Sequence, residues 1–77
     1  MMARRTVFCV QAYGRRDGRL VGAQRHEFTS ATEAEDAGAR LAATSAGVVV
    51  FAMEGDPEAG VWEELEIFAA HGDLPEE

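Results

Sequence analysis

Cys9 and His26 are the two residues that could form a reactive pair, because a thiolate beside an imidazole makes a nucleophile. They flank Asp17-Gly18, a dipeptide that strongly favours a hairpin turn between two strands. A two-residue loop would pair Cys9 directly with His26 on one face, whereas a three-residue loop with a glycine bulge would separate them. No nucleophile-elbow motif accompanies either residue. We therefore interpret Cys9 as a small buried apolar residue and predict no catalytic residue.

Zinc binding is the second chemistry that these side chains suggest. Cys9, His26, His71 and a carboxylate such as Asp73 supply suitable donor atoms, but no C-x-x-C or H-x-x-x-H pair brings them together locally. The acidic stretch 54–58 lacks the register of an EF-hand calcium loop. We expect neither a metal ion nor a cofactor.

Three arginines, Arg15, Arg16 and Arg19, surround the predicted turn. Guanidinium groups suit phosphates and carboxylates, so these are candidate binding residues for an anionic ligand or a nucleic acid. A solvated hairpin tip is the simpler interpretation. Nucleic acid is not expected as a partner, because the net charge is −7 and the strands lack the aromatic pattern of an RNA-binding sheet.

The charge of the chain is strongly polarised. Residues 1–28 hold six arginines against Asp17 and Glu27, and residues 29–77 hold Arg40 against twelve carboxylates. The two parts carry +4 and −11, which gives the total of −7. This polarity leaves a further function open, in which the acidic part acts as a decoy or inhibitor that occupies a basic protein surface.

Three glutamates lie close together near the C-terminus. Glu64 and Glu66 are expected on one face of the last predicted strand, and Glu63 is expected on the other. Paired carboxylates could do acid–base work, but only in a cleft with a suitable partner. We interpret them as charges that protect an edge strand against aggregation.

The length of 77 residues predicts one small domain, residues 1–77, with a flexible tail at 74–77. Hydrophobic residues make up 47% and charged residues 27% of the chain, which is ordinary for a globular domain. A lone cysteine suits a reducing compartment. No apolar run approaches the ~18 residues of a membrane span, and the short apolar run near the start does not resemble a signal peptide. We expect a cytoplasmic protein with no membrane contact.

Turn and capping signals divide the chain into five elements. Ser30-Ala31-Thr32-Glu33 has the pattern of a helix capping box. Val48–Met53 is an unbroken apolar run, typical of a strand buried on both faces. Glycines and Asp56-Pro57 predict a turn over residues 54–60. The predicted elements are strands at 6–13 and 20–28, a helix at 31–46, and strands at 48–53 and 61–70, the last with helix as its competitor.

These elements predict the α+β fold class with the order ββαββ. The first and third strands are the most apolar and belong in the middle, which gives a four-stranded antiparallel sheet of order 2-1-3-4 with one helix on one face. The side chains that the helix turns inward are small, including Ala34, Ala37 and Gly38. The helix must therefore lie close to the strands that it covers.

Both faces of the predicted sheet are apolar. The first strand places Val7, Cys9 and Tyr13 on one face and Phe8, Val10 and Ala12 on the other. The last strand is expected to alternate in the same way, with Val61, Leu65, Ile67 and Ala69 on one side and Trp62, Phe68 and Ala70 on the other.

One thin helix can cover only one of these faces, and the other would expose a larger apolar patch than a monomer usually carries. A second copy of the chain, packed sheet against sheet, is the simplest cover. We therefore predict a homodimer, with Tyr13, Trp62 and Phe68 as candidate interface residues. An unidentified protein partner remains a second possibility.

Two segments of the C-terminal half carry a resemblance to a known group of proteins. Gly55-Asp56-Pro57-Glu58-Ala59-Gly60, followed by Phe68-Ala69-Ala70-His71-Gly72-Asp73-Leu74-Pro75, resembles a pattern in short uncharacterised bacterial proteins. The resemblance covers residues 47–75. That group has no established activity, so it implies no catalytic residue.

Taken together, the residues predict a small non-enzymatic protein-interaction module of the cytoplasm, acting as a homodimer. Binding of an anionic ligand or a nucleic acid through Arg15, Arg16 and Arg19 is the alternative. The acidic decoy is the further alternative. These three functions depend on different surfaces of the molecule, so the structure of those surfaces bears on the choice.

Overall fold

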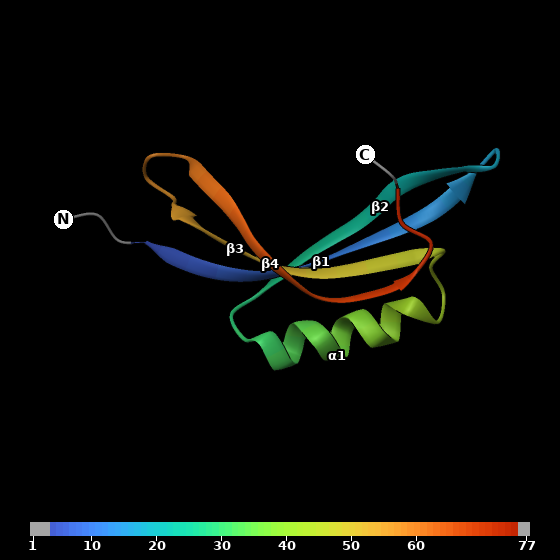
Figure 1. Ribbon diagram of the computed structural model, residues 1–77, viewed down its shortest axis with the longest axis horizontal. Helices are drawn as coiled ribbons and strands as arrows, with labels where there is room; N and C mark the ends of the chain where they lie inside the picture. The colour runs from blue at the N-terminus through green and yellow to red at the C-terminus, as the bar shows by residue number, and fades with distance from the viewer. Residues whose placement is uncertain (1–3, 76–77) are drawn as a thin grey trace.

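The computed structural model describes residues 4–75 and confirms the predicted α+β fold. Its elements are β1 (Arg5–Arg16), β2 (Arg19–Phe28), α1 (Ala31–Ala42), β3 (Gly47–Asp56) and β4 (Val61–Gly72). The four strands form one antiparallel sheet of order β2-β1-β3-β4, as predicted, and α1 runs along one face of it (Figure 1). Glu76 and Glu77, the end of the predicted tail, lie outside the described residues.

The first hairpin turns at Asp17-Gly18, as predicted. Arg16 pairs with Arg19, so the loop has two residues, and both have positive φ, at 53° and 79°. This is the geometry of a turn whose twist matches that of the strands. A bulge interrupts the hairpin further on, because Ala12 pairs with Gln24 while Tyr13 pairs with Gly22. One extra residue of β2 therefore shifts the register of everything beyond it.

The helix begins where the capping box predicts and ends earlier than expected. The Ser30 hydroxyl accepts a hydrogen bond from the Glu33 amide at 3.4 Å. The predicted helix over 31–46 is wrong at its end, since α1 stops at Ala42. The chain then turns back to the sheet, where the Ala46 amide donates to the Tyr13 carbonyl at 2.8 Å. That bond with β1 replaces the last helical turn.

The core between α1 and the sheet is thin and made of small side chains. Its buried members are Val10, Ala12, Ala34, Ala37, Val48 and Val50, with Phe8, Phe28, Leu41 and Phe68 packed around them. A Cβ at Gly38 would stand 2.6 Å from Val50 Cγ2. The expected close approach of helix and sheet is therefore confirmed, and it depends on a residue without a side chain.

The second hairpin is longer than predicted. Residues 54–56, expected in a turn, continue β3 and pair with β4, so this part of the prediction is wrong. The reversal is confined to residues 57–60. Asp56 is buried, and its carboxylate accepts a hydrogen bond from the Glu58 amide at 2.9 Å while its carbonyl accepts one from Gly60 at 2.9 Å. Asp56 thus organises the turn and lets both strands extend to its base.

Residues 61–70 form a strand, as preferred, and the helical alternative is wrong. Two bulges interrupt the pairing of β4 with β3: Phe51 and Ala52 pair with Ile67 and Glu66, but Val50 pairs with Ala69 and Met53 with Glu64. Leu65 and Phe68 are the extra residues. Each extra residue reverses the alternation of the side chains that follow it.

The bulges correct the predicted faces of β4. Trp62 and Ile67, expected on opposite faces, both lie on the face away from α1, and Phe68 packs on the helix side against Phe8, with ring centroids 5.7 Å apart. Glu64 and Glu66, expected together, are separated by the bulge at Leu65. The face away from α1 therefore gains an isoleucine, a tryptophan and a glutamate from one edge strand.

Candidate functional site

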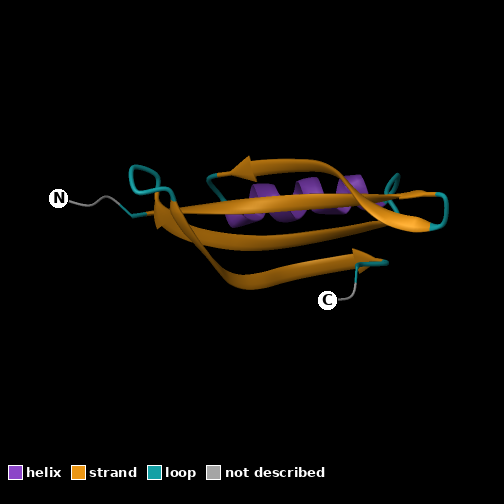
Figure 2. Cartoon of the chain, turned by 90° about the horizontal axis from the view of Figure 1, so that it is seen from above, coloured by secondary structure: helices purple, strands orange, loops and turns teal. Residues whose placement is uncertain are grey.

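The candidate site is the face of the sheet that α1 leaves uncovered, which we call the open face. In Figure 2 the strands lie between the viewer and the helix, and no helix lies on the near side of them. All four strands contribute to this face. Its residues are Val7, Cys9, Gln11, Tyr13, Arg25, Glu27, Val49, Phe51, Met53, Trp62, Glu64 and Ile67.

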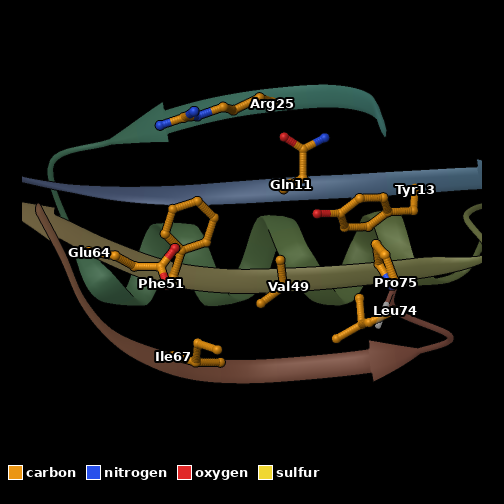
Figure 3. A pocket seen from close by; sticks show the side chains of 9 residues that line it. All are labelled: Gln11, Tyr13, Arg25, Val49, Phe51, Glu64, Ile67, Leu74 and Pro75. Carbon is orange, nitrogen blue, oxygen red and sulfur yellow. The ribbon is translucent and has the colours of Figure 1, made fainter. Parts of the chain in front are cut away.

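Two hollows lie side by side on the open face. Figure 3 shows the hollow that is lined by more residues, nine against five, which we call the larger hollow although its volume of about 390 Å³ is close to that of the other. Its floor is apolar, with Val49, Phe51 and Ile67, while Gln11 and Arg25 stand on one side and Glu64 on the other (Figure 3). It is therefore an apolar depression bordered by opposite charges.

The second hollow has a volume of about 400 Å³ and is lined by Val7, Arg25, Glu27, Met53 and Trp62. Trp62 is held in place by Gly55, its neighbour across β3 and β4. A side chain at Gly55 would stand 2.8 Å from the indole ring, so the ring occupies the space that a Cβ would need. Trp62 as a whole residue is 37% exposed, and its indole ring lines this hollow.

Arg25 divides the two hollows and lines both. Its guanidinium lies 5.7 Å from the centroid of the Phe51 ring, and Nη2 donates to Met53 Sδ at 3.0 Å and toward Cys9 Sγ at 3.8 Å. Cys9 is consequently fully buried, although no helix covers it. The arginine side chain partly covers Cys9, and its guanidinium contacts an aromatic ring and two sulfur atoms.

The edge of the open face along β4 is the most exposed apolar part. Ile67 is 59% exposed, whereas Val7 and Phe51 in the centre are 7% and 8% exposed. A large aliphatic side chain that stands free in water gains free energy from any apolar cover, at roughly 25 cal/mol per Å². The open face thus has an exposed apolar rim and a centre that is already buried from water.

The charges of the open face have no ionic partners within residues 4–75. The ion pairs of this part of the chain join Arg4 to Glu54 at 3.1 Å and Arg15 to Asp73 at 2.7 Å. Arg25 and Glu64 take part in neither pair, although they border the same hollow. A surface that covers this face would have to satisfy both.

The end of the described chain borders the open face. The Asp73 amide donates to the Ala46 carbonyl at 2.9 Å, and the Asp73 carboxylate accepts from Arg15. Leu74 and Pro75 then line the larger hollow beside Tyr13 (Figure 3). The first two residues of the predicted tail are therefore part of the candidate site.

The arginines of the hairpin tip differ in their availability. Arg15 is engaged by Asp73 at 2.7 Å and also donates to the Gly18 carbonyl at 3.3 Å. Arg16 and Arg19 pair across the turn and are exposed. The three guanidinium groups are not equally free to hold one anion, because Arg15 binds a carboxylate of its own chain.

Cys9 and His26 do not share a face. The loop has the two residues that would pair them, but the bulge after Ala12 shifts the register, and Cys9 pairs with Glu27 while Val10 pairs with His26. His26 lies on the helix side, beside Phe28 and Leu41. The buried thiol has no imidazole beside it, which matches the interpretation of Cys9 as an apolar residue.

Two of the three candidate interface residues, Tyr13 and Trp62, lie on the open face. Phe68 does not join them, because the bulge at Leu65 reverses the alternation after it and so turns Phe68 to the helix side. Sequence reasoning did not single out Arg25, and it named Glu64 only among the charges of the last strand and Ile67 only among its apolar residues. The number of residues between Arg25 and the turn could have placed Arg25 on the open face, but only if the position of the bulge had been known.

No protein-family model, curated protein or solved structure matches this chain. Among the described residues, no group of three or more histidine, cysteine, aspartate or glutamate side chains is placed to hold a metal ion. The helix within residues 4–75 is twelve residues long and cannot cross a membrane. The open face therefore has to be interpreted from its own chemistry.

Proposed function

We propose that this protein is a small non-enzymatic protein-interaction module that works as a homodimer, with two copies packed open face to open face. The observation that carries the proposal is the exposed apolar rim of the open face, where Trp62 is 37% and Ile67 59% exposed beside an apolar centre that is already buried. Exposed apolar side chains that continue a buried apolar cluster are typical of a surface that another protein covers. A second copy of the chain is a partner that is present wherever the protein itself is present.

The dimensions of the face are adequate for a stable pair. Four strands of about ten residues make a surface of roughly 19 Å by 33 Å from the usual strand spacing and rise. Its area of about 600 Å² before side-chain relief approaches the ~800 Å² per partner of a standard interface. Two such sheets pack about 10 Å apart in known sandwiches, which leaves room for one layer of side chains from each copy.

Self-association also suits the shape and the charge of the face. The rim residue Ile67 stands above the sheet, and the two hollows lie beside it. Arg25 gives the face one positive charge, and Glu27 and Glu64 give it two negative charges, so a second copy can present an opposite charge to Arg25. A two-fold dimer uses the same patch on both copies and buries both at once.

The compartment and the lack of an enzymatic role form part of the same proposal. Cys9 is buried as a free thiol, which is stable in the reducing cytoplasm. The hollows are lined by apolar side chains without a nucleophile and base in contact. We therefore propose a cytoplasmic protein whose activity is binding.

Sedimentation equilibrium of the wild type and two matched variants tests this proposal. Ile67→Glu and Val61→Glu introduce the same charge on one strand at similarly exposed positions, 59% and 54%, but on opposite faces. We expect the wild type and Val61→Glu to sediment at twice the 8.3 kDa of one chain at micromolar concentration. Ile67→Glu should weaken the dimer by 100-fold or more, because the carboxylate would have to lose its water.

Two results would refute the proposal. One is a wild type that stays at 8.3 kDa up to hundreds of micromolar. The other is an equal effect of the two substitutions, which would place the interface elsewhere. Circular dichroism of both variants confirms that the sheet is retained.

A further inference from the structure

We propose, resting on the homodimer of the preceding section, that the two-fold axis runs along the strands and that Arg25 of each copy forms an ion pair with Glu64 of the other. The proposal names the contact that orients the two sheets. It follows from where the two charges lie on the open face and from the few ways in which a two-fold axis can relate two sheets.

The guanidinium of Arg25 and the carboxylate of Glu64 lie at the same level along the strands. Arg25 pairs with Gln11, but its side chain runs along the sheet until Nη2 meets Met53 Sδ at 3.0 Å. Glu64 is the residue that pairs with Met53. Figure 3 shows both groups at the same end of the larger hollow, on either side of Phe51.

The two charges come from opposite edges of the sheet. Arg25 belongs to β2 and Glu64 to β4, the outermost strands in the order β2-β1-β3-β4. Neither takes part in the ion pairs of residues 4–75, which are Arg4 with Glu54 and Arg15 with Asp73. Sulfur atoms and an aromatic ring are weak partners for a guanidinium, so Arg25 keeps most of its capacity for a carboxylate.

A two-fold axis that packs two aligned sheets face to face lies between them, either along the strands or across them. An axis along the strands keeps each residue at its own level and exchanges left and right, so β2 of one copy faces β4 of the other. An axis across the strands places each strand opposite its own copy. The sequence of the open face distinguishes these two arrangements through charge.

With the axis along the strands, each Arg25 meets a Glu64 of the second copy, and the dimer contains this pair twice. With the axis across the strands, the levels along the strands are reversed, so Arg25 faces β2 of the second copy, where Glu27 is the carboxylate on this face, and Glu64 faces β4. Opposite charges that lose water together can form a strong charge-assisted pair. An axis along the strands is therefore the arrangement that brings Arg25 and Glu64 from opposite edges together.

Three charge-reversal variants and one mixture test the pairing: Arg25→Glu, Glu64→Arg, the double variant with both changes, and an equimolar mixture of the two single variants. Each single variant should weaken the homodimer at least ten-fold, because it places like charges opposite each other twice. The double variant restores both opposite-charge contacts between identical chains and should return to within about three-fold of the wild-type dissociation constant. The mixture should form a heterodimer of similar strength, because each chain again meets the opposite charge.

Matched controls separate a specific contact from a general effect of charge. Arg16→Glu at the hairpin tip and Glu63→Arg on the opposite face of β4 change the net charge by the same amounts. Both should leave the dimer within about three-fold of the wild type. Dissociation constants come from sedimentation, and native mass spectrometry counts heterodimers in the mixture.

The outcomes distinguish this inference from the proposed function. A wild-type dimer whose single variants bind as tightly as the wild type overturns the pairing but leaves the homodimer standing. Recovery in the double variant without recovery in the mixture shows that the two charges act within one chain, which also overturns it. A wild type that is monomeric refutes the proposed function and this inference with it.

Discussion

The two faces of the sheet solve the burial of apolar surface in different ways. Beneath α1 the buried side chains are valines and alanines, and Gly38 lets the helix backbone approach until Val50 is fully buried. On the open face the central residues are larger, and Arg25 is the side chain that lies over Phe51 and Cys9. The helix side is thus covered by α1, which packs close to the sheet, and the open face is covered only in the middle, by Arg25. This contrast supports the proposal that the open face is a contact surface.

The helix side is the more sensitive of the two faces to added volume. Gly38→Leu should destabilise the fold by about 3 kcal/mol, because a Cβ at this position would already stand 2.6 Å from Val50 Cγ2. Urea unfolding measures the free energy of unfolding. Gly14→Ala is the control, since nothing lies within 4 Å of a Cβ at Gly14, and it should change stability by about 0.5 kcal/mol or less. Equal effects of the two substitutions would show that α1 does not approach the sheet as described.

Val49 and Val50 allow the two faces to be compared with one substitution on one strand. Val50 is fully buried under α1, and Val49 is half-buried in the larger hollow. Val50→Ala should lower the free energy of unfolding by about 2 kcal/mol, and Val49→Ala by about 1 kcal/mol or less when measured on the monomer.

Self-association should respond in the reverse order to the same two substitutions. Val49→Ala removes apolar surface from the proposed interface, so it should weaken the dimer about five-fold, while Val50→Ala leaves that surface unchanged. Denaturation at two protein concentrations and sedimentation measure the two quantities. If Val50→Ala weakens association more than Val49→Ala, the assignment of stability to the helix side and of association to the open face is wrong.

The smallest expected effect concerns the border of the open face. Asp73→Asn removes the pair with Arg15, whose side chains are 49% and 66% exposed, so the cost should be about 0.5 kcal/mol or less. The effect should vanish in 1 M salt, where exposed charges are screened. Thermal unfolding at low and high salt measures it. A loss of more than about 1.5 kcal/mol would mean that the C-terminal segment is essential to the fold and not only to the face.

The arrangement of strands was predictable because it depends on strong local signals. Asp17-Gly18 determines the first hairpin, Ser30 begins the helix, and the apolar run at 48–53 has to lie in the middle of the sheet. Each of these signals acts through a backbone preference or through the burial of a whole strand. Neither effect depends on single-residue register.

The candidate site was less predictable because it depends on register. Bulges at residue 23, at Leu65 and at Phe68 each shift the alternation by one residue. Gly22 beside the first is a residue type typical of a bulge, but no residue type marks the two insertions in β4. The position of Arg25 over Phe51 follows from the first bulge, and the presence of both Trp62 and Ile67 on the open face follows from the bulge at Leu65. Alternation counted along the sequence therefore misplaced Phe68 and gave no indication of Arg25.

The bulges in β4 have one more consequence, for the size of the assemblies that the protein can build. A free strand at the rim of a sheet could template the addition of further chains side by side and so start a filament. The extra residues at Leu65 and Phe68 break the regular ladder of amide and carbonyl groups along that rim. The bulges therefore obstruct the addition of further chains along the edge of β4. In the proposed dimer, each copy covers the open face of the other, so neither open face is left for a third copy. Assembly of this chain should stop at two.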